Sequence, residues 1–148
     1  MGVVVSIHLV PIRNEPAIEL EVAHFIADYG LEGDWRARPG HGRQMTLVEA
    51  ETLERVAAKL GLGAVPPGAS RRQVVVRAVD LNAMIGRHLR IGAVLVAVEK
   101  PCDPCSRMEL TIGRGARDAM DGRGGVCARV VESGAIRPGD TVIPVDIQ

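Results

Sequence analysis

This sequence has few aromatic side chains and no excess of either charge. Only three of its 148 residues are aromatic, Phe25, Tyr29 and Trp35, and 18 Lys and Arg side chains balance 18 Asp and Glu side chains. Proteins that bind nucleic acids usually carry a basic surface, and those that bind single strands add rings on which the bases stack. We therefore expect no nucleic acid partner.

Cysteines and long apolar runs are also few. Three cysteines are too few and too unevenly spaced for the disulfide framework of a secreted domain, and the sequence has no apolar run of the ~18 residues that a membrane-spanning helix needs. The apolar segment 2–12 is broken by Ser6 and His8 and lacks a basic leader, so it predicts a strand rather than a signal peptide. We expect a cytoplasmic protein with no membrane partner.

The chain does have enough apolar residues for a core, and its charges are unevenly distributed. Its 148 residues match the usual length of one domain and 47% of them are hydrophobic, which favours a single domain over residues 1–148. Residues 1–70 hold six basic and nine acidic side chains, residues 71–129 hold eleven and six, and residues 130–148 hold one and three. Sixteen of the 18 cations are arginine, which is suited to bidentate binding of phosphate or carboxylate. This pattern favours a small anionic ligand, with a solvated Arg-rich surface as the alternative.

Short stretches of β-branched and alternating residues predict a mainly β fold. We expect about seven short strands, one α-helix and short helical turns, arranged as a closed or nearly closed barrel because a barrel leaves no open edges. The expected strands cover residues 2–10, 18–22, 73–79, 88–91, 93–99, 126–132 and 141–147. Short helical turns are expected at 80–86 and 114–120.

A capping box and an apolar stripe predict the one helix. Thr46 and Glu49 have the Thr-x-x-Glu spacing, in which each side chain bonds to the backbone N–H of the other residue. The apolar residues that follow have the i, i+3, i+4, i+7 spacing of one helix face: Leu53, Val56, Ala57 and Leu60. Gly61 then provides a stop. The sequence therefore predicts a helix that begins at Thr46 and ends at Gly61.

The segment 100–107 carries the most distinctive chemistry. Two prolines restrict the backbone around Cys102 and Cys105, which have a C-x-x-C spacing. The nearby cations Lys100 and Arg107 favour the thiolate, which is the form that attacks sulfur or binds a metal.

Several other roles are open for the cysteines. A zinc site would need further ligands from Cys127 or the four histidines, because the sequence has no second C-x-x-C. A thioredoxin-like site needs the pair at a helix N-terminus, whereas the sequence after Cys105 resembles a strand. Inert cysteines in a turn are the third alternative, and core packing is the expected role of Cys127.

Arginine and amide side chains stand just before two predicted elements. Arg71, Arg72 and Gln73 precede a strand, where they can clamp a phosphate or contact the edge of a heterocycle. Arg43 and Gln44 precede the predicted helix, whose N-terminus also favours an anion. Exposed charges that protect a sheet edge are the alternative.

Two more candidates lie in the glycine-rich loop 30–42. His41 is the histidine that we would test as a functional residue, whereas His8 and His24 are expected to be packing residues of the strand-rich N-terminal part. For Asp34, stabilisation of a turn is the simplest role.

The order of these motifs resembles the MOSC domain family, which is named after the C-terminal domain of molybdenum cofactor sulfurase. The resemblance runs in order over about residues 3–145, through segments 30–34, 43–49, 71–76, 80–86, 101–105, 125–130 and 134–140. It implies a β-barrel of the MOSC or pyruvate-kinase type that binds the molybdenum cofactor, an anionic molybdopterin, or carries sulfur to it.

The resemblance also implies site residues. Cys105 matches the invariant thiol of the family and would be the catalytic residue and the molybdenum ligand. The cofactor-binding residues that it implies are Arg43, Gln44, Thr46, Arg71, Arg72, Gln73, Asp103 and Cys105. Family members usually have Asn where this chain has Gln73, and the extra methylene displaces the amide.

Three functions are open on this sequence. The first is the reduction of N-hydroxylated compounds by a cofactor bound through Cys105, as in relatives such as the mitochondrial amidoxime-reducing component. Because the sequence has no flavin, haem or iron–sulfur motif, this function implies an external electron donor protein. The second is sulfur transfer through a Cys105 persulfide that a sulfur donor protein loads. The third is a ligand-binding barrel without catalysis; the sequence does not define the substrate or the oligomeric state.

Overall fold

The computed structural model describes residues 2–66 and 68–146, and most of its regular structure is β. In chain order the strands are β1 (Gly2–Leu9), β2 (Ile18–Leu20), β3 (Ala23–Ile26), β4 (Gly30–Leu31), β5 (Met45–Glu49), β6 (Val74–Arg77), β7 (His88–Ile91), β8 (Val94–Pro101), β9 (Val126–Glu132), β10 (Gly134–Ile136) and β11 (Thr141–Val145). The helices are α1 (Ala50–Leu60), the short 3₁₀-helix η1 (Asn82–Met84), α2 (Ser106–Ile112) and α3 (Ala116–Ala119).

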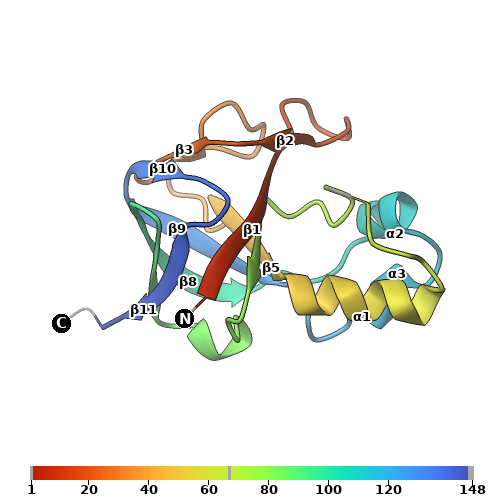
Figure 1. Ribbon diagram of the computed structural model, residues 1–148. Helices are drawn as coiled ribbons and strands as arrows, with labels where there is room; N and C mark the ends of the chain where they lie inside the picture. Colours follow the sequence, from red (N-terminus) through yellow and green to blue (C-terminus); the bar gives the residue numbers. More distant parts are fainter. Residues whose placement is uncertain (1, 67, 147–148) are drawn as a thin grey trace.

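Seven of the strands close into a barrel (Figure 1). Their order is β11-β7-β8-β9-β5-β6-β1, and β1 pairs back with β11 through Gly2 and Val3. β2 extends the sheet beyond β1, and a small second sheet has the order β10-β3-β4. The mainly β barrel that the sequence predicts is confirmed, and so are the short helical segments at 80–86 and 114–120, which contain η1 and α3.

Helices α1, α2 and α3 lie together on one side of the barrel (Figure 1), and the burial pattern of β5 and β6 reflects this. β5 and β6 run parallel and are joined through α1. Leu47 and Val74 point into the barrel core, whereas Val48 and Val75 belong to a second apolar cluster with residues of the helices. Because both faces of these strands are covered, their sequences are apolar without clean alternation. No helix within the described ranges is long and apolar enough to cross a membrane.

The predicted helix start at Thr46 is wrong, although the predicted end is confirmed. Residues 45–49 form β5, and α1 begins only at Ala50, with Glu49 as an N-cap that makes no side-chain capping bond. The backbone N–H of Thr46 bonds to the side chain of Gln73 instead of closing a capping box. At the other end, Gly61 has the left-handed conformation of a helix C-cap, with φ of 71°.

A second difference concerns the sequence after Cys105. It looks β-like, but residues 106–112 form α2, and Cys105 is the N-cap residue of that helix. Met108 and Ile112 bury their side chains in the cluster between the helices and the barrel. Tertiary packing of this apolar face decides the local conformation against the strand-like composition.

Candidate functional site

A cavity of about 730 Å³ opens beside the end of β8 and the start of β9. Residues after β1, before β5, before β6, after β8 and at the start of β9 contribute to its walls. Cys102, Cys105 and Cys127, the three cysteines of the chain, all line it. The cavity therefore brings together side chains that lie more than a hundred residues apart in sequence.

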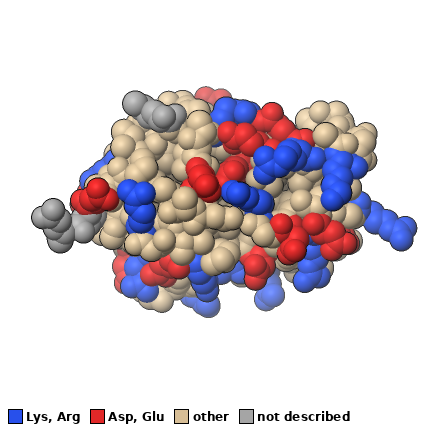
Figure 2. Space-filling model, turned by 90° about the horizontal axis from the view of Figure 1, so that it is seen from below, with Lys and Arg blue, Asp and Glu red and all other residues tan. Residues whose placement is uncertain are grey.

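Positive charge dominates the lining of the cavity. Eight cationic side chains and one acidic side chain, that of Asp103, line it. The cations are Arg13, Arg36, Arg38, Arg43, Arg71, Arg72, Lys100 and Arg107. By contrast, the face of the molecule in Figure 2 shows Lys and Arg side chains interspersed with Asp and Glu side chains. A lining so rich in guanidinium groups suits an anion such as a phosphate.

Arg72 fixes the backbone of the cysteine-containing segment. Its side chain is buried, and its Nε donates to the carbonyl of Gly124 at 2.8 Å. Its Nη2 donates to the carbonyls of Cys102 at 3.2 Å and Asp103 at 2.9 Å. Gly124 also permits the close approach of this segment, since a Cβ there would lie 2.4 Å from the carbonyl oxygen of Cys102. Arg72 thus holds the cysteine segment in place through three carbonyl groups.

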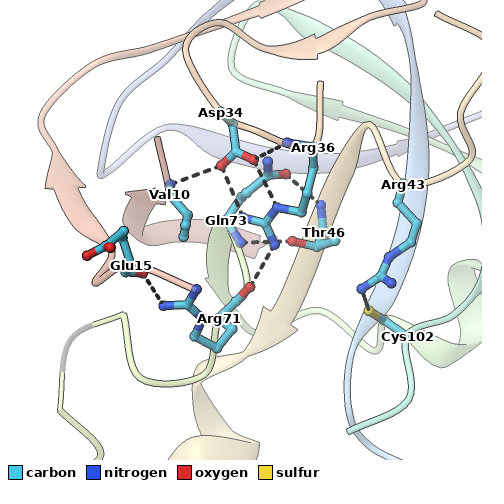
Figure 3. Close-up of polar contacts among 9 residues, drawn as sticks. All are labelled: Val10, Glu15, Asp34, Arg36, Arg43, Thr46, Arg71, Gln73 and Cys102. Atoms are coloured by element: carbon cyan, nitrogen blue, oxygen red, sulfur yellow. Dashed lines mark hydrogen bonds and ion pairs between the residues drawn. The ribbon is translucent and has the colours of Figure 1, made fainter. Parts of the chain in front are cut away.

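Three neighbouring groups favour the thiolate of Cys102. A hydrogen bond from the Cys127 thiol, together with the charges of Arg72 and Arg43, lowers the pKa of Cys102 to about 6, although burial opposes this shift. Arg43 Nη2 lies 3.6 Å from Cys102 Sγ (Figure 3). The same hydrogen bond and burial raise the pKa of Cys127. Cys127 is buried, as its strand pattern predicts, but it also faces the cavity.

Cys105 differs from the other two cysteines in its exposure. It is partly exposed, whereas Cys102 and Cys127 are buried. Its place at the N-cap of α2, in an extended conformation, puts it at the edge of the segment that Arg72 holds. Of the three thiols lining the cavity, Cys105 is therefore the most accessible to a large ligand.

A chain of hydrogen bonds supports the part of the cavity wall that Arg36 and Arg71 form (Figure 3). The buried carboxylate of Asp34 accepts from the N–H of Val10 and from Nε and Nη2 of Arg36, each at 2.9 to 3.0 Å. Arg36 Nη1 donates to the carbonyl of Arg71, whose own Nη1 donates to the carbonyl of Glu15. Arg71 has φ of 63°, a left-handed conformation that costs energy for a non-glycine residue. Asp34 therefore forms an ion pair with Arg36 and stabilises the backbone of the cavity wall, in addition to the stabilisation of a turn that the sequence predicts.

Burial and hydrogen bonding set the charges of two residues near the cavity. Burial, reinforced by the positive charges of Arg38, Arg43 and Lys100, lowers the pKa of His41 below its usual 6.5, so the ring is neutral at pH 7. His41 Nδ1 accepts from the N–H of Arg43, which leaves the proton of the neutral ring on Nε2. Burial alone would raise the pKa of Asp34, but the hydrogen bonds and charge of Arg36 lower it below its usual value.

The predicted cofactor-binding residues divide into two groups. The structure brings Arg43, Arg71, Arg72, Asp103 and Cys105 together in the lining of the cavity. Three other predicted residues are buried and are not part of that lining as the structure describes it: Gln44, Thr46 and Gln73.

The three buried residues connect strands to each other and to a loop. Gln44 Nε2 donates to Asp28 Oδ1, and Gln44 Oε1 accepts from the N–H of Val130. Gln73 Oε1 accepts from the N–H of Thr46 at 2.9 Å, and Thr46 Oγ1 accepts from the N–H of Gln73 at 2.9 Å. These polar groups satisfy each other inside the protein, which gives them a structural role in the position of β5 and β6.

We expect Gln73→Asn to destabilise the fold, even though Asn is the usual residue at this position in the family that the sequence resembles. The shorter side chain withdraws the acceptor from Thr46 and leaves a buried N–H unpaired, at a cost of about 1–3 kcal/mol in the free energy of unfolding. Urea unfolding measures this loss. Gln73→Met is the control, because it keeps the length and removes the acceptor; full stability of Gln73→Met would contradict the explanation.

Some cavity residues were not identifiable from local sequence patterns. Trp35 lines the cavity with its ring 44% exposed, and the guanidinium carbon of Arg13 lies 5.4 Å from the ring centroid. Trp35 lies in the glycine-rich loop, which the sequence marks as a candidate functional segment. No local pattern predicts that Arg13 or Cys127 lines the same cavity. Within residues 2–66 and 68–146, no three His, Cys, Asp or Glu side chains form a cluster that could hold a metal ion.

Comparisons with known proteins agree with the barrel and its motifs. The family model described as MOSC domain matches residues 34–143. The solved structure of the YUAD protein from Bacillus subtilis has a TM-score of 0.81 at 17% identity, covering 96% of this chain and 94% of that chain. No match was found among curated proteins.

Two structures of YiiM are also similar to this chain. YiiM from Geobacillus stearothermophilus has a TM-score of 0.77 at 18% identity, covering 99% of this chain and 76% of that chain. YiiM from Escherichia coli has a TM-score of 0.76 at 18% identity, covering 100% of this chain and 71% of that chain. At these identities the likeness shows a shared fold.

Proposed function

The chain belongs to the MOSC domain family, and from this premise we propose that its cavity binds the molybdenum cofactor with Cys105 as the metal ligand. The proposed reaction is the reduction of an N-hydroxylated base, in which two electrons and two protons from the solvent cleave the N–O bond and give the amine and water. Both electrons would come from an external donor protein. When bound, the cofactor would supply the redox chemistry of this reaction.

One observation carries the proposal: the same cavity holds the partly exposed Cys105 thiol and eight cationic side chains. The cofactor combines a metal, which needs an anionic ligand such as a thiolate, with a phosphate, which needs guanidinium donors. A volume of about 730 Å³ is within the range of small-molecule and cofactor sites. The residues present therefore fit the group.

Unused hydrogen-bond donors support an anion in this cavity. Arg43 Nε and Arg107 Nε are buried and have no hydrogen-bond partner among the described residues. Both side chains line the cavity, so a phosphate bound there would supply the partner that these donors lack. Arg72 differs, because its Nε and Nη2 are committed to carbonyl groups of the protein; it would position Cys105 by holding the preceding segment.

Two uncharged groups at the cavity would orient the remaining parts of the ligand. The half-exposed ring of Trp35 offers a flat surface for a heterocycle. The neutral ring of His41 presents Nε2–H as a hydrogen-bond donor, because its Nδ1 already accepts from the backbone. These residues would direct a bound molecule, while the arginines would neutralise its charge.

We expect protein purified from cells with intact cofactor biosynthesis to contain molybdenum and pterin, and Cys105→Ala to lose at least about 90% of the molybdenum, because the thiolate ligand is gone. Elemental analysis and pterin fluorescence measure both. Leu110→Ala on the adjacent helix is a matched control, since Leu110 is 76% exposed, and it should keep the wild-type content. Absence of molybdenum and pterin from the wild type would overturn the proposal.

The exposure of Cys105 also favours a second candidate, sulfur transfer through a persulfide. A persulfide anion on this thiol would be stabilised by the same cationic lining. Mass spectrometry of the wild type would then show an addition of about 32 Da on Cys105, reversed by a reductant. Reduction of a hydroxylamine with an artificial electron donor separates the two candidates, because only the first predicts turnover.

A further inference from the structure

Cys102 and Cys127 are brought together by the pairing of β8 with β9. In this ladder Lys100 lies opposite Cys127, and the N–H of Cys102 donates to the carbonyl of Gly125 at 2.8 Å. Cys102, the residue that follows β8, is therefore a diagonal neighbour of Cys127 on β9. Both face the same cavity, although they are only 3% and 1% exposed.

The surroundings of this pair distinguish its two sulfur atoms. Arg43 Nη2 lies 3.6 Å from Cys102 Sγ and favours its thiolate, while the neighbouring Cys102 and burial raise the pKa of Cys127, so that its thiol keeps its proton. A thiolate is the form of cysteine that attacks peroxides. The cavity provides a path for a molecule as small as hydrogen peroxide to Cys102.

We propose that Cys102 and Cys127 form a peroxide-reactive dithiol, in which Cys102 is oxidised first and Cys127 then closes a disulfide. The Cys102 thiolate attacks one oxygen of a hydroperoxide, so that an S–O bond forms, the O–O bond breaks, and the leaving oxygen takes up a proton as water or an alcohol. Cys102 thereby loses two electrons and becomes a sulfenic acid, and the peroxide gains them.

The second step consumes the neighbouring thiol. Cys127 Sγ attacks Cys102 Sγ, the S–S bond forms, the S–O bond breaks, and the released hydroxide takes the proton of Cys127 to leave as water. In total, two thiols and one hydroperoxide give one disulfide, one water and one further water or alcohol. Diagonal residues on paired strands lie about 7–8 Å apart, whereas a disulfide spans Cα atoms up to about 6.8 Å apart, so closure requires the segment after β8 to move toward β9.

The structure favours Cys127 over Cys105 as the partner in this disulfide. Cys127 lies diagonally opposite Cys102 in the β8–β9 ladder, whereas Cys105 is the N-cap residue of α2, three residues further along a segment that contains Pro104. The proposal does not depend on the molybdenum cofactor, because it uses neither Cys105 nor a metal.

The test is oxidation of the reduced full-length protein with hydrogen peroxide, followed by a thiol count and intact mass measurement after denaturation. The wild type has three free thiols, and we expect one to remain, with a mass decrease of about 2 Da. Cys105→Ser should go from two thiols to none, which identifies the bond as Cys102–Cys127. This variant also lacks the proposed metal ligand, so the result is independent of cofactor binding.

Two further variants assign the roles of the sulfur atoms. Cys127→Ala should stop at a sulfenic acid on Cys102, which a 1,3-dione reagent traps, and Arg43→Gln should slow the first oxidation by about tenfold. The proposal fails if Cys105→Ser keeps both thiols under conditions that oxidise the wild type, or if the wild-type product links Cys105 or two chains. Because Cys105 is partly exposed, the Cys105→Ser result decides the matter even if Cys127→Ala does not fold.

Discussion

Replacement of Arg72 by alanine is expected to cause one of the largest losses of stability in this protein. The substitution removes three hydrogen bonds to the carbonyls of Gly124, Cys102 and Asp103 and leaves those carbonyls without their donor. Hydrogen bonds to a charged group contribute about 1.5–3 kcal/mol each, and some carbonyls will gain water, so we expect a loss of about 3–5 kcal/mol in the free energy of unfolding. Urea unfolding at pH 7 measures it.

Two comparisons separate geometry from charge in this prediction. Arg72→Lys keeps the positive charge but lacks the planar fork that donates to separate carbonyls, so it should recover less than half of the loss. Arg117→Ala removes an exposed arginine on α3 and should change stability by less than about 0.5 kcal/mol. If Arg72→Lys matched the wild type, charge alone would explain the role of Arg72, and the carbonyl-clamp explanation would be wrong.

The sequence predicted the barrel because its strands have strong local signals. The predicted strands 88–91 and 126–132 coincide with β7 and β9, and both combine apolar residues with flanking turn residues. The start of α1 was not predictable in the same way. Thr46 satisfies a local capping pattern, yet its partner is Gln73, 27 residues away, and a distant buried hydrogen bond overrides a local one.

The candidate site was predictable to the extent that its residues form motifs. Arg71 and Arg72 before a strand, and Cys105 in a C-x-x-C segment, are recognisable without a structure, and the barrel brings them to one cavity. Arg13 and Cys127 carry no such local signal, because only the pairing of β8 with β9 and the course of the loop after β1 place them there. Gln73 stands beside the same motif, but its side chain is buried and accepts from the N–H of Thr46, a pairing that no local pattern predicts.

Asp34→Ala is expected to lower the free energy of unfolding at pH 7 by about 3–5 kcal/mol, because it removes one partner of a buried ion pair. The side chains of Asp34 and Arg36 are 0% and 10% exposed. Without the carboxylate, Arg36 keeps its charge in a poorly solvated place, and the N–H of Val10 loses its acceptor. The matched control is Asp146→Ala, which breaks an ion pair whose carboxylate side chain is 89% exposed and should cost less than about 1 kcal/mol.

The dependence of this loss on pH follows from the pKa of Asp34. Arg36 lowers the pKa of the folded carboxyl below its usual 3.8, so near that pH the unfolded chain binds more protons than the folded protein. The stabilisation by Asp34 is therefore fully present above about pH 5 and is lost as the pH falls through the folded pKa. Urea unfolding from about pH 7 to pH 3 should show the wild type losing stability more steeply than Asp34→Asn, so that the two curves converge in acid. Parallel curves would mean that the charge of Asp34 does not stabilise the wall of the cavity.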